Sequence, residues 1–153
     1  MVLYLPRDTA SVPVSRQVLD RCLDTLGVAP DTRADIALAL TEACANVIKH
    51  AGPGEEYEVR AVARAGQAII EVVNTGRGDG QPGQVAVTRD PVPATAEHGR
   101  GLTIMNAVVD NLRLTGNGRE GTTVHFEKAL EWLPGAPGQH LFNADDGRQE
   151  NRG

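Results

Sequence analysis

Two pairs of short β-forming segments, each pair joined through a glycine-containing turn, constrain the fold of this chain more than any other feature. The first pair is residues 57–63 and 68–74, which meet around Gly66. The second pair is residues 112–115 and 122–130. Two β-forming runs separated by a few turn residues are typical of an antiparallel hairpin. The sequence therefore predicts a sheet built largely from hairpins.

Three other segments have the apolar spacing of helices. The first has Pro13 in its first turn and Gly27 as its C-terminal stop. Its predicted apolar stripe is Val14, Val18, Leu19, Cys22, Leu23 and Leu26. The second helix is expected to run from an N-cap at Asp31 to about His50, and the third over residues 101–110.

The order of these elements predicts the fold class. A short strand at residues 2–5 precedes two helices, a hairpin, a long loop, a helix and a second hairpin. Because the alternating βαβ units of a Rossmann fold are missing, we expect an α+β fold. This is a two-layer α/β sandwich with helices on one face of a mostly antiparallel mixed sheet. Residues 1–133 are predicted to form one domain, and the polar residues 134–153 a disordered tail.

Composition excludes several classes of protein. The net charge is −5 and the Lys and Arg residues are scattered, which argues against a nucleic-acid-binding face. Residues 1–6 do not resemble a signal peptide, and no apolar run approaches the roughly 20 residues that span a bilayer. We therefore expect a cytoplasmic protein that binds no membrane. Cys22 and Cys44 lie in apolar segments and are predicted to be buried free thiols.

The second predicted helix carries the candidate catalytic residues. Its buried face is expected to be Ile36, Leu40, Ala43 and Val47. Beside that face runs a polar stripe of Asp35, Glu42, Asn46, Lys49 and His50. Glu42 and Asn46 are four residues apart, so their side chains project together from successive turns. A stripe of this kind also occurs as the solvated face of an ordinary amphipathic helix, and the stripe by itself does not exclude that alternative.

Three glycine-containing segments lie at the ends of other elements. Residues 74–78, Asn-Thr-Gly-Arg-Gly, follow an apolar strand, and residues 99–102, Gly-Arg-Gly-Leu, open the third helix. Glycine-backed amides at a helix start, with an Arg beside them, form a phosphate site. Residues 121–123, Gly-Thr-Thr, begin the last strand. Each segment taken alone is also compatible with an ordinary turn.

In this order, the segments resemble the nucleotide-binding boxes of the GHKL ATPases, and most closely those of bacterial anti-sigma-factor serine kinases. Residues 42–50 match the N box, and residues 74–78, 99–102 and 121–123 match the three glycine boxes. The resemblance covers roughly residues 1 to 130.

The resemblance implies that the domain binds ATP and Mg²⁺. By position, Glu42 matches the general base and Asn46 matches the Mg²⁺ ligand. The positions that match nucleotide-binding residues of the family are Asn46, Lys49, His50, Asn74, Gly76, Gly78, Gly99, Arg100, Gly101, Leu102, Thr122 and Thr123. In the family the position of Asn74 is normally an Asp that accepts a hydrogen bond from the adenine amino group.

The resemblance also implies a function. We expect an ATP-dependent serine/threonine protein kinase that phosphorylates an anti-anti-sigma-type regulatory protein in bacterial partner switching. A sigma factor is a second expected partner, and a homodimer is the expected assembly. The alternative is a binding module that keeps the GHKL fold but has weak or lost ATP use, and Asn74 favours this alternative.

Overall fold

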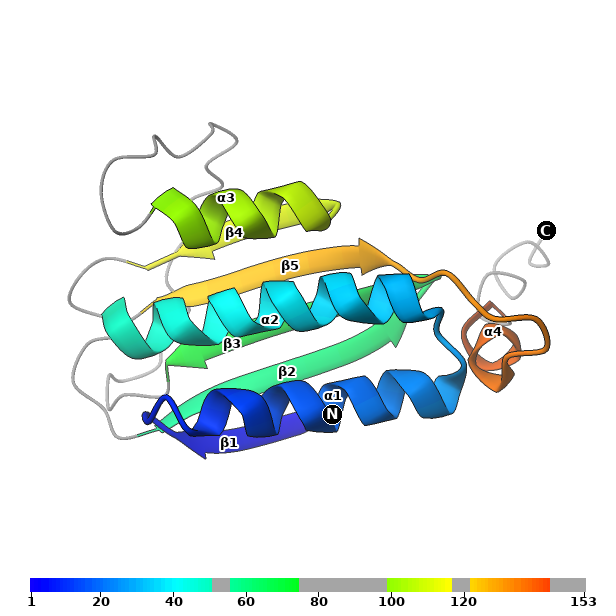
Figure 1. The fold of residues 1–153 in the computed structure, drawn as a ribbon, viewed down its shortest axis with the longest axis horizontal. Helices are drawn as coiled ribbons and strands as arrows, with labels where there is room; N and C mark the ends of the chain where they lie inside the picture. Colours follow the sequence, from blue (N-terminus) through cyan, green and yellow to red (C-terminus); the bar gives the residue numbers. More distant parts are fainter. Residues whose placement is uncertain (51–55, 75–98, 117–121, 144–153) are drawn as a thin grey trace, which may run out of the picture.

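The computed structural model describes residues 1–50, 56–74, 99–116 and 122–143 (Figure 1). In chain order its helices and strands are β1 (Val2–Pro6), α1 (Ser11–Leu26), α2 (Pro30–His50), β2 (Glu56–Arg64), β3 (Gln67–Asn74), α3 (Gly99–Val108), β4 (Asn111–Thr115), β5 (Thr123–Ala129) and α4 (Pro137–Asn143). Every strand and helix expected from the sequence is present, and α4 is an addition.

Five strands form one sheet in the order β1-β2-β3-β5-β4, and all its pairings are antiparallel. Both predicted hairpins are confirmed, as β2 with β3 and as β4 with β5. In the turn between β2 and β3, Ala65 has φ 48° and Gly66 has φ 74°. Positive φ at both residues is typical of the type I′ turn, whose twist suits an antiparallel hairpin. Between the described strands the sheet is therefore wholly antiparallel rather than mixed.

Helices α1, α2 and α3 cover one face of this sheet (Figure 1). Their apolar side chains meet alternate residues of the strands, and the two sets form one core. The predicted inner face of α2 is confirmed, since Ile36, Leu40, Ala43 and Val47 are all buried. The predicted two-layer α+β fold is confirmed. Helix α2 begins at Pro30, so Asp31 lies in its first turn rather than capping it.

The buried stripe of α1 differs from the predicted one. Val14 is half-exposed and Cys22 is exposed, so the expectation that both cysteines are buried is wrong for Cys22. The buried residues of α1 are Ser11, Val12, Ser15, Leu19 and Leu23. The two serines are tolerated because each is hydrogen-bonded: Ser11 Oγ lies 2.6 Å from Tyr57 Oη, and Ser15 Oγ donates to the carbonyl of Val12. A prediction based on apolar spacing could not find this stripe, because two of its members, Ser11 and Ser15, are polar.

The predicted disordered tail is wrong for residues 134–143. Helix α4 lies within this range and packs at the junction of α1 and α2 (Figure 1). Gly27 ends α1 with φ 87°, as predicted, and a Cβ at this position would lie 2.5 Å from Cβ of Ala136. Trp132 stacks on Phe142, with ring centroids 6.5 Å apart. Low local hydrophobicity hid this segment, because its docking depends on a few contacts with a distant part of the chain, such as that of the buried Ala136 with Gly27. Residues 144–153 lie outside the described residues.

Candidate functional site

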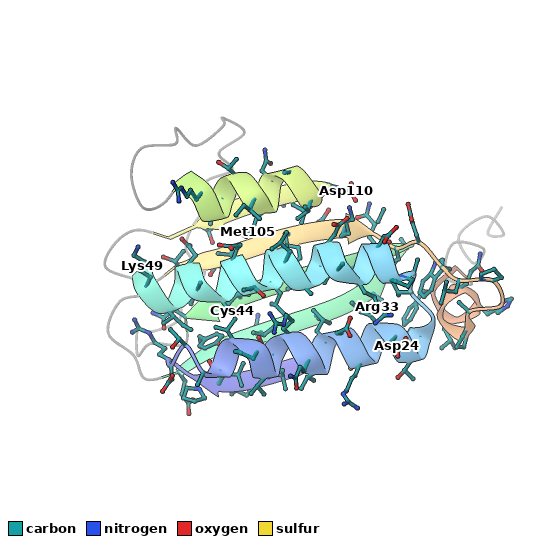
Figure 2. The ribbon with its side chains drawn as sticks, viewed as in Figure 1. Asp24, Arg33, Cys44, Lys49, Met105 and Asp110 are labelled. Atoms are coloured by element: carbon teal, nitrogen blue, oxygen red, sulfur yellow. The ribbon has the colours of Figure 1, made fainter. Side chains whose placement is uncertain are left out.

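Segments that are far apart in the sequence meet at one end of the sheet. The C-terminal half of α2, the end of β3, the start of α3 and the start of β5 all lie at the end drawn on the left of Figure 1. Lys49, near the end of α2, marks this end in Figure 2. The topology explains the convergence: β3 ends where the antiparallel β5 begins, and Val73 pairs with Thr123. We call this end the candidate site.

Glu42 and Asn46 lie at the border between the buried and the exposed sides of α2, and both are half-buried. They occupy successive turns of one helix face, as their spacing predicts. Asp35, which the sequence analysis placed in the same stripe, has a different role. Its carboxylate lies 3.1 Å from Nζ of Lys128, at the far end of β5 from the candidate site. Within the polar stripe of α2, Asp35 therefore differs from Glu42 and Asn46, because it pairs with β5 away from the candidate site.

The carboxylate of Glu42 touches the first turn of α3. A Cβ atom built on Gly101, the third residue of α3, would lie 2.8 Å from Oε2 of Glu42. Gly99 and Arg100 precede Gly101 in the same turn, and Arg100 is exposed. The first amides of a helix lack intrahelical partners and carry partial positive charge, so this turn favours anions. The fold thus brings the predicted general base and the predicted phosphate-binding turn into contact.

Asn74 lies on the helix-covered side of the sheet. It pairs with the fully buried Tyr57 in the strand register, and its backbone N–H donates to the carbonyl of Thr122 (3.3 Å). Thr123 pairs with Val73 and belongs to the opposite, uncovered face, since successive strand residues alternate. Of the two threonines that match nucleotide-binding positions of the family, Thr122 is the one beside Asn74. The structure separates Thr123 from the other candidate residues.

The remaining candidate residues have different surroundings. Leu102 is buried in the core and anchors α3, so its side chain is not available to a ligand. Lys49 is exposed at the end of α2. The side chain of His50, together with Gly76 and Gly78, lies outside the described residues. The candidate site as described therefore consists of the pair on α2, the first turn of α3, Asn74 and Thr122.

In the part of the chain that the structure describes, no three His, Cys, Asp or Glu side chains are arranged to hold a metal ion. Magnesium bound with a nucleotide does not need such a group, because it takes one or two protein oxygens together with phosphate oxygens and water. The half-buried amide of Asn46 supplies an oxygen of this kind beside Glu42. The residues present thus fit a magnesium nucleotide. Among the described residues, no helix is long and apolar enough to cross a membrane.

Comparison with known protein families shows which family the chain belongs to. Residues 5–128 match the family model described as the Histidine kinase-like ATPase domain. The chain belongs to the histidine kinase-like ATPase family. The predicted relationship to the GHKL ATPases is confirmed, and α4 lies outside the matched range.

Relatives of this histidine kinase-like ATPase include serine-protein kinases. The chain is 24% identical over 137 residues to the serine-protein kinase RsbW of Bacillus mycoides (strain KBAB4), and the alignment covers 84% of each chain. The RsbW proteins of Bacillus cereus (strain B4264) and Bacillus anthracis match with the same identity and coverage. Among solved structures, the mycobacterial sensor histidine kinase MprB matches 87% of this chain and 100% of its own, with 19% identity and a TM-score of 0.49.

In this ATPase domain, Lys128 of β5 contacts both α3 and α2, and these contacts were not predicted from the sequence. Nζ of Lys128 donates to the carbonyl of Val108 (2.8 Å), at the C-terminal end of α3, and also pairs with Asp35 of α2. The inward position of Lys128 could have been inferred from the sequence. Val124 and Phe126 of β5 point into the core, so alternation directs residue 128 to the same face. A charged residue on the covered face is a candidate for a specific partner.

Proposed function

We propose that this chain is an ATP-dependent serine/threonine protein kinase acting on a small regulatory protein. The observation that carries the proposal is the contact between the carboxylate of Glu42 and the first turn of α3 at Gly101. Phosphoryl transfer from a nucleotide to a hydroxyl needs a proton acceptor close to the place where the terminal phosphate is held. This contact supports such a place, because it joins a carboxylate to an anion-favouring helix start.

Each residue of the site has a distinct part in the proposal. The amide oxygen of Asn46 would hold Mg²⁺, the start of α3 with Arg100 would hold phosphate oxygens, and Asn74 would pair with the base. When bound, MgATP would supply the phosphoryl group, with the metal neutralising charge on the phosphate oxygens. Glu42 would take the proton of the substrate serine hydroxyl. The serine oxygen would bond to the γ-phosphorus of ATP as the bond between that phosphorus and the leaving ADP breaks.

The partner class follows from the resemblance of the four boxes to anti-sigma-factor kinases. We propose an anti-anti-sigma-type protein as the phosphorylated partner and a sigma factor as a second binding partner. The net charge of −5 and the scattered basic residues support protein partners rather than nucleic acid. The proposal places the chain in the cytoplasm as a homodimer, and sedimentation equilibrium tests the dimer.

The test separates nucleotide binding from phosphoryl transfer. Proteins captured from native lysate on the immobilised chain, in MgATP and in MgADP, supply the acceptor. We expect Glu42→Gln to bind MgATP almost as tightly as the natural chain and to transfer phosphate about 10²–10⁴-fold more slowly. Glu131→Gln, at an exposed position beyond β5, is the matched control. Equal loss of binding and rate would make Glu42 a structural residue, and a natural chain that binds no nucleotide would end the proposal.

Asn74 favours a second candidate function. An Asn offers a neutral acceptor where the family normally has a charged one, and such a loss costs about 1–2 kcal/mol. The alternative is a GHKL-fold module that binds its partner protein without efficient use of ATP. Capture of the same partner with and without nucleotide, together with no phosphate transfer, would favour this alternative.

A further inference from the structure

Gly101 touches the side chain on which the proposed reaction depends, and the inference drawn from this contact rests on the proposed function. A Cβ at position 101 would lie 2.8 Å from Oε2 and 3.8 Å from Cδ of Glu42. Contacts of less than 3.0 Å are essentially never made by real Cβ atoms. The carboxylate therefore occupies the space that a side chain at position 101 would need.

The backbones on both sides of this contact are held by the core. Helix α3 is anchored by the buried Leu102 and Met105, and α2 by the buried Ala43. Oε2 of Glu42, in contrast, is the far end of a long side chain, which can move by changing rotamer. If a methyl group were added at position 101, the carboxylate would yield and the two helices would stay in place.

Electrostatics explains why the carboxylate lies against this turn. The first turn of α3 contains no acidic residue of its own. A helix start favours a negative charge, and here Glu42 supplies that charge from the neighbouring helix. A glycine at position 101 lets the carboxylate approach the turn closely, where a larger residue would hold it away.

We propose that Gly101 is a positioning residue for Glu42: the missing side chain lets the carboxylate rest where it accepts the substrate proton. This role is separate from any contact between the backbone of α3 and phosphate. It predicts that Gly101→Ala lowers the rate of phosphoryl transfer and leaves nucleotide affinity nearly unchanged, because only the base is displaced. A displacement of about 1 Å is enough to cost roughly 10²-fold in rate.

The kinetic test uses MgATP and the captured partner protein. We expect Gly101→Ala to lower kcat by about 10–10²-fold, with KM for MgATP within about twofold of the natural value. If Gly101 acts through Glu42, the variant carrying both Gly101→Ala and Glu42→Gln is no slower than Glu42→Gln alone. Asn106→Ala, at an exposed position of the same helix, is the control and should leave kcat unchanged. Additive losses, or a rise in KM as large as the fall in kcat, would overturn the positioning role.

A second measurement tests the contact without nucleotide. Ala is a better helix former than Gly, so in a Glu42→Ala background Gly101→Ala should raise the unfolding midpoint, by about 2–4 °C. With Glu42 present the rise should be smaller or reversed, because the carboxylate is displaced. Equal shifts in both backgrounds would show that the two residues do not touch and would overturn the inference. A natural chain that binds no MgATP would instead overturn the proposed function, and the positioning role with it, even where the midpoints reveal the contact.

Discussion

Gly138 of α4 packs directly against the indole ring of Trp132, so that a side chain at position 138 would overlap the ring. The same side chain would lie 2.8 Å from the carbonyl oxygen of Leu26, at the end of α1. Neither neighbour can easily move away from a side chain at position 138, because one is the backbone of Leu26 and the other is the Trp132 ring, which stacks on Phe142. This contact holds α4 on the end of the ATPase domain.

Gly138→Ala should therefore destabilise the folded chain. The added methyl group overpacks the contact, and we expect the free energy of unfolding to fall by about 1–3 kcal/mol. Urea unfolding followed by Trp132 fluorescence measures the loss, since this is the only tryptophan of the chain. Gln139→Ala, exposed on the same helix, should change stability little. Equal stability of the Gly138→Ala variant and the natural chain would mean that α4 is not docked as described.

Asn46→Ala tests the magnesium site. If its amide oxygen holds Mg²⁺, the variant should bind ATP with an affinity that no longer depends on Mg²⁺, while the fold survives because the side chain is only half-buried. Isothermal titration with ATP, with and without Mg²⁺, measures the difference, and circular dichroism checks the fold. A folded variant that keeps its Mg²⁺ dependence would remove Asn46 from the site.

Asn74→Asp restores the charged acceptor that the family normally has at the end of β3. We expect ATP binding to tighten by about 1 kcal/mol, or the preference for ATP over GTP to sharpen, because a charged acceptor forms the stronger hydrogen bond. Isothermal titration of the natural chain and of Asn74→Asp with ATP and with GTP, in excess Mg²⁺, measures both affinities. Recovery of binding only in the variant would favour the binding-module alternative. Weaker ATP binding in the variant would contradict the expected role of Asn74.

The two cysteines should differ sharply in reactivity. Burial raises the pKa of the Cys44 thiol to about 11, and this side chain is fully buried, whereas Cys22 is exposed. Because the thiolate is the reactive form, Cys44 should stay unmodified at pH 8 in the folded chain. We expect Ellman's reagent to titrate one thiol quickly and the second only in denaturant. Cys22→Ser should remove the fast reaction, and a fast reaction that survives this change would place Cys44 within reach of solvent.

Glu127 should make stability depend on pH in the acid range. Its pKa is lowered, first by the hydrogen bond from His125, whose Nε2 lies 3.1 Å from the carboxylate. A carboxylate with a lower pKa in the folded state contributes stability in full above its unfolded pKa, about 4.3, and this contribution is lost as the pH falls through the folded value. Glu127→Gln should therefore flatten the fall in unfolding free energy below about pH 5. Glu131→Gln is the control, and equal slopes for the natural chain and Glu127→Gln would contradict the role of this pair.

Local patterns determined most of the fold. Gly66 between two β-forming runs predicts the β2–β3 hairpin, because a turn with positive φ is set by its own residues. The inner face of α2 follows from the 3.6-residue period of Ile36, Leu40 and their neighbours. The ordered boxes indicated the family in the same way, since each box is a short run of adjacent residues. None of these inferences depends on which distant segments touch.

Contacts between distant segments were decided only by the tertiary structure. The sequence treated Thr122 and Thr123 as equivalent, and strand pairing with β3 put them on different faces. It also assigned the segment around Gly138 to a disordered tail, although this segment packs on the end of α1. The contact between Glu42 and Gly101 joins residues from two helices. Burial and contact are properties of pairs of segments, and periodicity within one segment carries no information about its partner.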